Sequence, residues 1–166
     1  SLFESIISDL DNRGLILRRG TIVDATIVNS ARRYHKEKNR NDNYPTSPVL
    51  PDRDNQVNTD SSRKEAQQDH DATVTKKGNK YYYGYKGHIG TDQGSDIIRR
   101  KQFTPANIHD KQKSRVRCAV ERPFAHMKKW YGYVRARYVN LKRNDLHFTF
   151  LCIIYNVRRG IVLIES

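Results

Sequence analysis

Two acidic residues of this sequence stand where carboxylates are uncommon, and they are the ones best suited to chemistry. Asp24 lies in the middle of the β-branched run "TIVDATIV". Asp is depleted in strands because it competes with the backbone ladder and must be desolvated. The alternation of a strand places Asp24 on the face of Ile22, Thr26 and Val28. A carboxylate kept there indicates a bound metal ion or catalysis, with a satisfied Asp on an edge strand as the alternative.

Glu121, in "VRCAVERPFAHMKKWYG", is the second such residue because its surroundings are strongly basic. Residues 111–143 hold eleven Lys and Arg and this single acid. If residues 115–131 are helical, Arg117, Glu121 and Lys128 fall along one stripe. The stripe is either a surface ladder of ion pairs or a carboxylate metal ligand whose flanking cations hold phosphates.

Together the two acids fit one known chemistry. A pair of Mg²⁺ ions held by carboxylates from a strand and a neighbouring helix activates water or a 3′-hydroxyl at a DNA phosphodiester. Mg²⁺ prefers hard oxygen ligands, so Asp and Glu suit it better than His or Cys. Asp24 and Glu121 are therefore the candidate catalytic and metal-ligating residues, and the basic surroundings of Glu121 would grip the DNA.

The charge of the whole chain supports a polyanionic partner. Its 166 residues fit a single domain, and 36% hydrophobic against 30% charged residues keep it within the globular class. The formal net charge is +13. A charge this large and this clustered favours nucleic acid, although a generally basic soluble protein is the simpler alternative.

The remaining composition indicates a reducing interior and no membrane. Cys118 and Cys152 are too few and too far apart for a disulfide framework or a zinc site. No apolar run reaches the roughly 18 residues that span a bilayer, and no segment resembles a signal peptide. The chain begins "SLFES" without an initiator Met, which predicts a fragment of a longer protein.

The elements that must position the two acids alternate between helix and strand. Apolar spacing predicts a helix that ends at Gly14, and β-branched density predicts a strand in "GTIVDATIVNS". Residues 32–79 are polar and carry three prolines in "YPTSPVLP", so we expect a loop or disordered insertion there.

The second half of the sequence predicts a hairpin and two helices. Strand-like runs flank "TDQGSD", whose Asp92 and Asp96 are expected to cap the turn. A helix then carries Glu121, with Pro123 either kinking it or marking its start. A last, nearly apolar helix is expected to begin at Asn144 as its N-cap and to pack against the sheet.

Five blocks of this sequence carry a family resemblance. They are "GTIVDATIVNSARR", "TKKGNKYYYGYKGHIGTD", "FTPANIHD", "RCAVERPFAHMKKWYGYVRARYVNLKRNDLHF" and "LCIIYNVRR". In order and content they resemble successive blocks of bacterial insertion-sequence DDE transposases, of the groups named after insertion sequences four and five. The resemblance covers nearly everything outside the polar segment, and it implies a ribonuclease-H-like fold.

The resemblance assigns roles to individual residues. The Asp of the "VDATI" strand is the family's first catalytic acid and matches Asp24, and the Glu of the "VERPF" block is the third and matches Glu121. The family's signature places an Arg four residues before that Glu and a Lys seven after it, which matches Arg117 and Lys128. Ser114 stands where the family has a Tyr.

One departure from the family concerns the second catalytic Asp. In the family it lies on a strand between the "ANIHD" block and the Glu helix, whereas only "KQKSRV" separates Asp110 from Arg117 here. Six residues cannot hold a strand and a return crossover, which takes a dozen or more. The block is expected to be deleted, and the helical region that precedes the first strand is mostly absent. Asp110 is interpreted as a helix N-cap rather than a ligand.

We therefore expect an α/β fold: a ribonuclease-H-like mixed sheet with flanking helices that lacks the strand of the second Asp. The function implied by the resemblance is DNA transposition, by metal-dependent cleavage and strand transfer at transposon ends, in a truncated and internally deleted remnant. A catalytically dead DNA-binding protein, or an inhibitor of an intact transposase, is the alternative. The expected DNA contacts are Arg117, Lys128, Lys129, Arg135, Arg137, Lys142 and Arg143.

The same resemblance implies the cofactors and partners. Mg²⁺ or Mn²⁺ would occupy a two-ion site in the intact family. The partner would be double-stranded DNA at transposon ends, together with a second copy of the chain or an intact transposase. The expected location is the bacterial cytoplasm, at the nucleoid.

Overall fold

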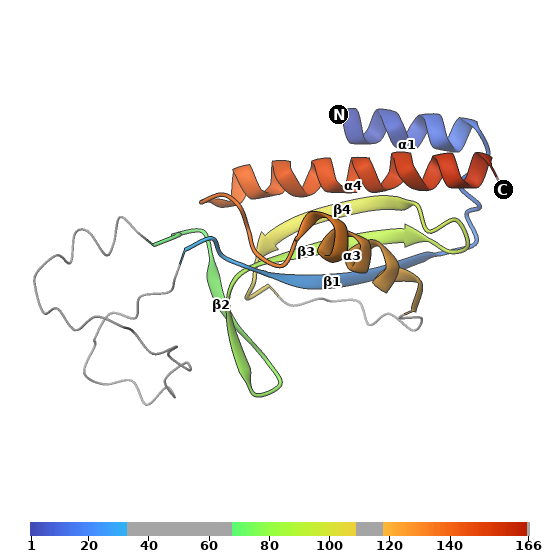
Figure 1. Cartoon of the computed structure of the whole chain (residues 1–166). Coiled ribbons are helices and arrows are strands. Elements are labelled where there is room, and N and C mark those ends of the chain that lie inside the picture. Colours follow the sequence, from blue (N-terminus) through green and yellow to red (C-terminus); the bar gives the residue numbers. More distant parts are fainter. Residues whose placement is uncertain (33–67, 109–117, 166) are drawn as a thin grey trace, which may run out of the picture.

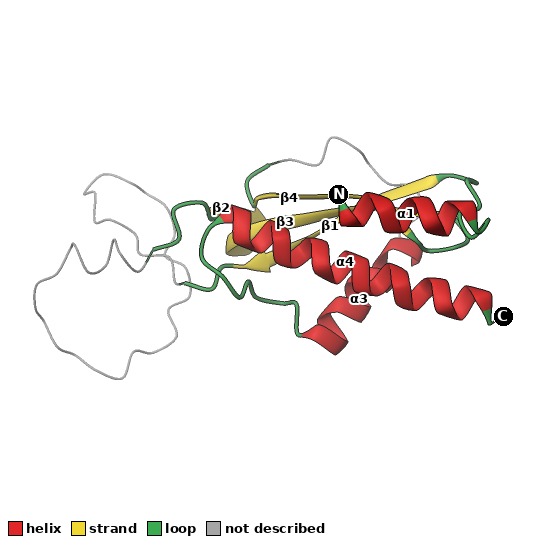
Figure 2. Ribbon diagram, turned by 90° about the horizontal axis from the view of Figure 1, so that it is seen from above, coloured by secondary structure: helices red, strands yellow, loops and turns green. Residues whose placement is uncertain are grey.

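An antiparallel sheet forms the base of the fold, and helices cover one of its faces (Figures 1 and 2). The computed structural model describes residues 1–32, 68–108 and 118–165. Within them the strands are β1 (Thr21–Asn29), β2 (Thr73–Lys77), β3 (Lys80–Asp92) and β4 (Ile98–Pro105). β3 is the central strand, because β1 pairs with one edge of it while β2 and β4 share the other.

Three helices accompany the described part of the sheet. They are α1 (Leu2–Asn12), α3 (Cys118–Tyr131) and α4 (Leu141–Ile164). α4 runs along the sheet over β4, and α1 lies beside the C-terminal half of α4 (Figure 1). α1 begins with a capping box, in which Ser1 and Glu4 satisfy each other's backbone N–H groups. The predicted first helix, first strand and hairpin are therefore confirmed.

Alternation along β1 and β3 builds the core between the sheet and α4. Ile22 and Val28 of β1 and Tyr85 and Ile89 of β3 are all buried. Gly87 leaves the space for the ring of Phe148 on α4, because a Cβ at Gly87 would lie 3.1 Å from the Cζ of that ring. Close packing of this kind holds α4 at a fixed height above the sheet.

A buried carboxylate, Asp69, ties the sheet to the start of α4. It is fully buried and accepts hydrogen bonds from the Ser30 hydroxyl at 3.0 Å, the Tyr85 hydroxyl at 2.7 Å and the Asn140 backbone N–H at 3.1 Å. Burial, and then the bond to Asp69, raise the pKa of the Tyr85 hydroxyl. A buried charge is tolerated only when it is paired or fully hydrogen-bonded, so these donors fix the geometry.

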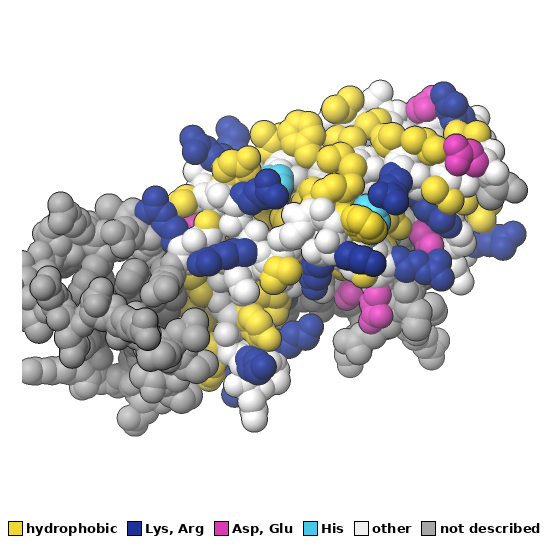
Figure 3. All heavy atoms as spheres, viewed as in Figure 1, with side chains coloured by type: hydrophobic (Ala, Val, Ile, Leu, Met, Phe, Trp, Pro, Cys, Tyr) yellow, Lys and Arg dark blue, Asp and Glu magenta, His cyan; other side chains and the backbone are white. Residues whose placement is uncertain are grey.

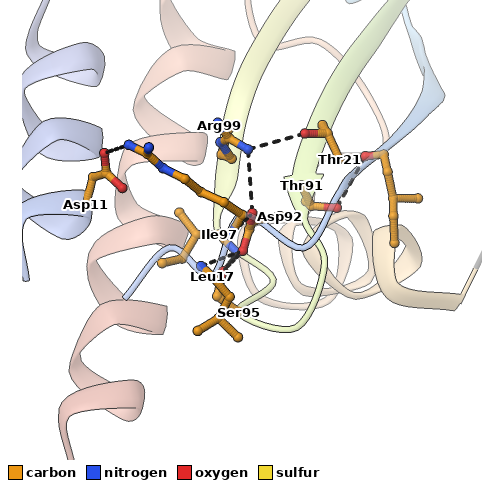
Figure 4. A network of polar contacts seen from close by, with 10 residues as sticks. Asp11, Leu17, Thr21, Thr91, Asp92, Ser95, Ile97 and Arg99 are labelled. Atoms are coloured by element: carbon orange, nitrogen blue, oxygen red, sulfur yellow. Dashed lines mark hydrogen bonds and ion pairs between the residues drawn. The ribbon is translucent and has the colours of Figure 1, made fainter. Parts of the chain in front are cut away.

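A second buried carboxylate, Asp92, closes the other end of the sheet (Figure 4). It accepts the backbone N–H groups of Leu17 at 3.0 Å and Arg18 at 3.1 Å, and the Ser95 hydroxyl at 2.9 Å. The link between α1 and β1 is thereby bound to the β3–β4 turn. The prediction that Asp92 caps the turn is confirmed, because its side chain accepts from the Ser95 hydroxyl within the turn. The Asp96 side chain, which was expected to cap the same turn, instead accepts from Arg122 at 2.7 Å.

Three sequence predictions are corrected. The polar segment 32–79 is structured at its end, because β2 pairs with β3 and Asp69 lies in the core; residues 33–67 lie outside the described part. The last helix begins at Leu141 with Asn140 as N-cap, whose side chain accepts from the Arg143 N–H. Asn144 is instead buried, and its amide donates to the Tyr138 and Asn140 carbonyls.

The third correction concerns the expected mixed sheet. All pairings between the described strands are antiparallel, and parallel pairing occurs there as an isolated bridge between Asn29 and Arg135. β1 therefore has a strand partner on one side only among the described residues.

Replacing Asp69 with Ala is expected to lower the free energy of unfolding by about 3 kcal/mol, because it leaves buried donors without an acceptor. Urea denaturation measures the change. The matched control is Asp9→Ala, which removes an exposed ion pair with Arg13 at 3.0 Å and should cost less than about 1 kcal/mol. Equal losses from the two variants would contradict the role given to Asp69.

Candidate functional site

Asp24 occupies the face of β1 that α4 covers. It pairs in register with Ile89 of β3, and Thr26 pairs with Gly87, which packs under Phe148 of α4. Paired residues of antiparallel strands point to the same face. The prediction that Asp24 shares a face with Ile22, Thr26 and Val28 is confirmed; those three are buried and Asp24 is half-buried.

β1 is an edge strand within the described part of the chain. At its end, Asn29 donates its backbone N–H to Val134 at 3.2 Å and accepts at 2.7 Å from Ala136, on the side away from β3. Alternation along the strand then directs the peptide groups of Val23 and Ala25 to the same side. Asp24 therefore lies beside a row of backbone groups on which another strand could pair.

Glu121 lies in the first turn of α3 and is exposed. Phe124 and Met127 of α3 are buried in the same core cluster as Ile22 of β1. α3 packs against β1, so the helix that carries Glu121 lies against the strand that carries Asp24. Pro123 lies inside the helix, near its start, which accords with its expected place close to Glu121.

The described residues do not complete a two-ion metal site. Within residues 1–32, 68–108 and 118–165, no group of three or more His, Cys, Asp and Glu side chains could hold a metal ion. Asp24 and Glu121 are hard oxygen donors of the kind that Mg²⁺ prefers. A two-ion site needs enough anionic oxygens to hold both ions at a fixed separation, and the two carboxylates among the described residues do not supply them.

The expected DNA contacts gather on one continuous stretch of chain, which we name the α3–α4 basic surface. It runs from the last turn of α3 to the first turn of α4 and contains no acid. All its cations are exposed: Lys128, Lys129, Arg135, Arg137, Lys142 and Arg143. Lys and Arg side chains are spread over the face seen in Figure 3. Arg117 lies outside the described residues.

The α3–α4 basic surface is held against the sheet rather than carried on a free loop. The Arg135 guanidinium donates from Nε to the Ser30 carbonyl at 2.9 Å, next to the bridge between Asn29 and Arg135. The buried Tyr133 stacks on Phe148, with ring centroids 5.8 Å apart. These anchors fix the path of the backbone, so the exposed cations are presented at defined positions.

Two half-buried histidines beside this surface, which the sequence analysis missed, have environments that favour the neutral form. His126 lies among the rings of Trp130, Tyr131 and Tyr155, and neither of its ring nitrogens has a hydrogen-bond partner among the described residues. Burial, and then the nearby Arg158 guanidinium, lower the pKa of His126. The sequence signal that could have found His126 is its spacing of four residues from Trp130, which places the two rings side by side on one face of a helix.

His147 of α4 likewise packs among aromatic rings and has a lowered pKa. It packs against the edges of the Tyr133 and Tyr138 rings, and its Nδ1 has no hydrogen-bond partner. Burial, and then the charge of Arg137, lower the pKa of His147. Protonating either ring would place a second positive charge near an existing arginine, so both favour the neutral form.

Comparison with known proteins identifies one family. A family model described as "Transposase DDE domain" matches residues 16–113 and, in a second segment, residues 111–157. The two segments contain Asp24, Glu121 and the whole α3–α4 basic surface. No solved structure matches the chain.

The histidine environment predicts a pH dependence of stability. The pKa of His126 is lower in the folded state, so the folded protein binds fewer protons than the unfolded chain. The free energy of unfolding is therefore highest above about pH 6.5, the ordinary pKa of histidine, and decreases as the pH falls below that value. Urea midpoints between pH 7.5 and 5.5 measure this. His126→Phe should flatten the profile, whereas replacing the exposed His70 with Gln should leave it unchanged. A profile that His126→Phe does not alter would contradict the assignment.

Proposed function

This chain belongs to the family of transposase DDE domains, and from that premise we propose that it is a DNA-binding remnant of an insertion-sequence transposase that has lost cleavage activity. The family implies a role in DNA transposition, carried out at DNA in the cytoplasm. The observation that carries the proposal is the α3–α4 basic surface, a fixed and acid-free run of cations inside the matched segments.

Asp24 and Glu121 are the first and third acids of the family's triad in this proposal. Three observations support the assignment: both lie in matched segments, Asp24 is half-buried on a strand, and the helix of Glu121 packs against that strand. Transposases of this family use divalent metal ions. Asp24 and Glu121 would be the metal ligands that remain, and because this donor set is incomplete we derive no step through bound ions.

The second acid of the triad is proposed to be missing. The two matched segments meet at residues 111–113, which is where the sequence analysis expects the deleted block. The strand that carries this acid in the family adjoins the strand of Asp24, and the matching edge of β1 is open among the described residues. The incomplete set of metal-ligating carboxylates and the open edge of β1 both support the loss of the second acid, so we assign no step of cleavage to this chain.

DNA binding is assigned to the six exposed cations of the α3–α4 basic surface, with Arg117 as a seventh contact. Cations that neutralise phosphates release condensed counterions, which supplies affinity without reading sequence. The anchored backbone adds to this because it presents the charges in one geometry. In this reading the chain occupies transposon ends without cutting them.

Inhibition of an intact transposase is the second candidate function. A chain that keeps the DNA contacts and loses an acid would compete for the same ends. The open edge of β1 and the retained DNA surface favour this candidate over a protein with no remaining partner. Adding the purified chain to an active, intact copy of the transposase, in an excess of unrelated competitor DNA, tests this candidate: a lower yield of cut ends supports inhibition, and an unchanged yield contradicts it.

Duplex DNA binding should weaken steeply as salt rises. Log Kd is expected to change with log salt by about 0.9 per phosphate contacted. Replacing Arg135, Arg137, Lys142 and Arg143 with Ala should reduce that slope by about 3.6, which is four contacts at about 0.9 each. Fluorescence anisotropy with a labelled duplex between 50 and 200 mM salt, about the range where such contacts act, measures both slopes.

The matched control removes the same charge elsewhere. Arg13, Arg19, Lys77 and Lys80 are exposed and lie outside the α3–α4 basic surface. Replacing these four with Ala should leave most of the salt slope in place. Equal flattening by both sets would mean that net charge, rather than this surface, grips DNA.

The chain alone is expected to cleave no DNA. Loss of one acid leaves one ion of the pair without its own protein ligand, and Mg²⁺ is exacting about geometry. The assay uses purified protein, Mg²⁺ or Mn²⁺, and DNA with the cognate ends. It is run beside a repaired chain into which the missing block of an intact copy has been inserted, which should cut.

Variants of the acidic residues show which result of the cleavage assay would contradict the proposal. Cleavage by the unrepaired chain, abolished by Asp24→Ala, would show that the deletion is tolerated and the proposal wrong. If Asp110→Asn also abolished it, Asp110 would be the substitute acid. Loss of cleavage in the repaired chain on Glu121→Gln tests the assignment of Glu121 separately.

A further inference from the structure

The outward face of α4 carries an unbroken row of exposed apolar side chains. They are exposed between 43% and 59%, and they recur at spacings of three and four residues: Leu146, Phe150, Ile154, Val157, Ile161 and Ile164. Such spacing places all six along one side of a helix. We name this row the α4 outer stripe. Apolar side chains gather along the upper part of the molecule in Figure 3, over α1 and α4.

The other sides of α4 are already packed. Phe148 faces the sheet, the Leu10 side chain of α1 lies against Gly160 on one flank, and Tyr155 meets the ring of His126 from α3 on the other. The α4 outer stripe is thus the remaining side, and the described residues leave it open. In a chain of net charge +13, a contiguous apolar row of this length indicates a binding surface.

We propose that a second copy of this chain covers the α4 outer stripe, with the two α4 helices packed antiparallel. The spacing of the stripe supports this orientation. Around a centre between Tyr155 and Asn156, Ile154 faces Val157 of the other copy and Phe150 faces Ile161. The outermost members also meet, because Leu146 then lies opposite Ile164.

The charges at the ends of α4 favour the same orientation. Exposed Lys142 and Arg143 lie in the first turn and exposed Glu165 lies at the C-cap. An antiparallel pair brings the cations of one copy next to the Glu165 of the other and also opposes the helix dipoles favourably. A parallel pair would instead place four cations together at one end.

The size of the stripe predicts weak association. From Leu146 to Ile164 it extends about 27 Å, and two stripes together would bury on the order of 1,000 Å². That area is at the lower limit for a specific interface. Mutual repulsion between two strongly positive chains opposes pairing further, and salt screens this repulsion. Pairing should therefore strengthen as salt rises.

A lipid bilayer is the competing occupant. α4 has 24 residues and is long and apolar enough to cross a membrane by length and composition, which the sequence analysis did not anticipate. Its other contacts favour a core helix. The Asn156 amide exchanges two hydrogen bonds of 2.8 Å with the Ile98 backbone, and the Arg159 Nε donates to the Ser95 carbonyl at 2.8 Å.

Sedimentation velocity over a range of protein concentrations tests the proposal. The chain should change from monomer to dimer as its concentration rises, and the dimer fraction should increase with salt. Replacing Ile154 and Val157 together with Glu should leave a monomer at every concentration. Val134→Glu is the matched control, because Val134 is 53% exposed but lies outside α4, and it should dimerise normally. Circular dichroism confirms that both variants fold.

Cross-linking tests the orientation. A chain with Ile154→Cys should form a disulfide-linked dimer with itself, since position 154 lies near the centre of the pair. Leu146→Cys alone should not, but mixed with an Ile164→Cys chain it should cross-link. The parent chain, which keeps Cys118 and the buried Cys152, gives the background.

Four results would overturn the proposal. They are a monomer at all concentrations, a dimer that the double Glu variant leaves intact, self-linking of Leu146→Cys, and sedimentation of the chain with vesicles of neutral phosphatidylcholine. The last result would assign the stripe to lipid. None of these outcomes depends on DNA binding or cleavage, so the proposal stands or fails apart from the proposed function.

Discussion

The buried carboxylate of Asp69 is the interaction on which the functional half of this fold depends. It joins three places that are distant in the sequence: Ser30 just after β1, Tyr85 on the central strand, and Asn140 just before α4. A charge with no exposure must keep all of its donors, so these segments cannot move apart without a large loss of stability. The start of α4 is thereby fixed relative to the strand that carries Asp24.

That constraint explains how the connection between α3 and α4 presents the proposed DNA contacts at fixed positions. The chain between Tyr131 and Leu141 is held from below by the Arg135 bond to Ser30 and by Tyr133 packed on Phe148, and at its end by Asn140 on Asp69. Its exposed cations then need little ordering on contact with a phosphate backbone. Binding that pays less entropy for ordering is tighter for the same contacts.

Local sequence patterns predicted the helices and strands. Contacts between residues far apart in the sequence determined the features that the sequence did not predict. β-branched density located the strand of Asp24, and helical spacing located α1 and the helix of Glu121, because these signals are short-range. Asp69 could not be predicted, since its partners lie 16 to 71 residues away and its neighbourhood is polar. The same contact explains why α4 begins at Leu141 and not after Asn144 as predicted: Asn140 caps the helix, and its backbone N–H is bound to Asp69. Helical periodicity alone did not show which apolar side of α4 the sheet would leave open.

The α3–α4 basic surface ends at Lys142 and Arg143, one helical turn before Leu146, where the α4 outer stripe begins. Salt weakens the grip of cations on DNA and screens the repulsion between two copies, so the two interactions respond to salt in opposite directions. DNA phosphates bound at the basic surface also neutralise charge that opposes pairing. In the proposed dimer, pairing and the proposed DNA binding are coupled, and by reciprocity the pair binds DNA more tightly by the factor with which DNA favours pairing. A bound duplex would thus supply the neutralisation that the apolar stripe needs at low salt.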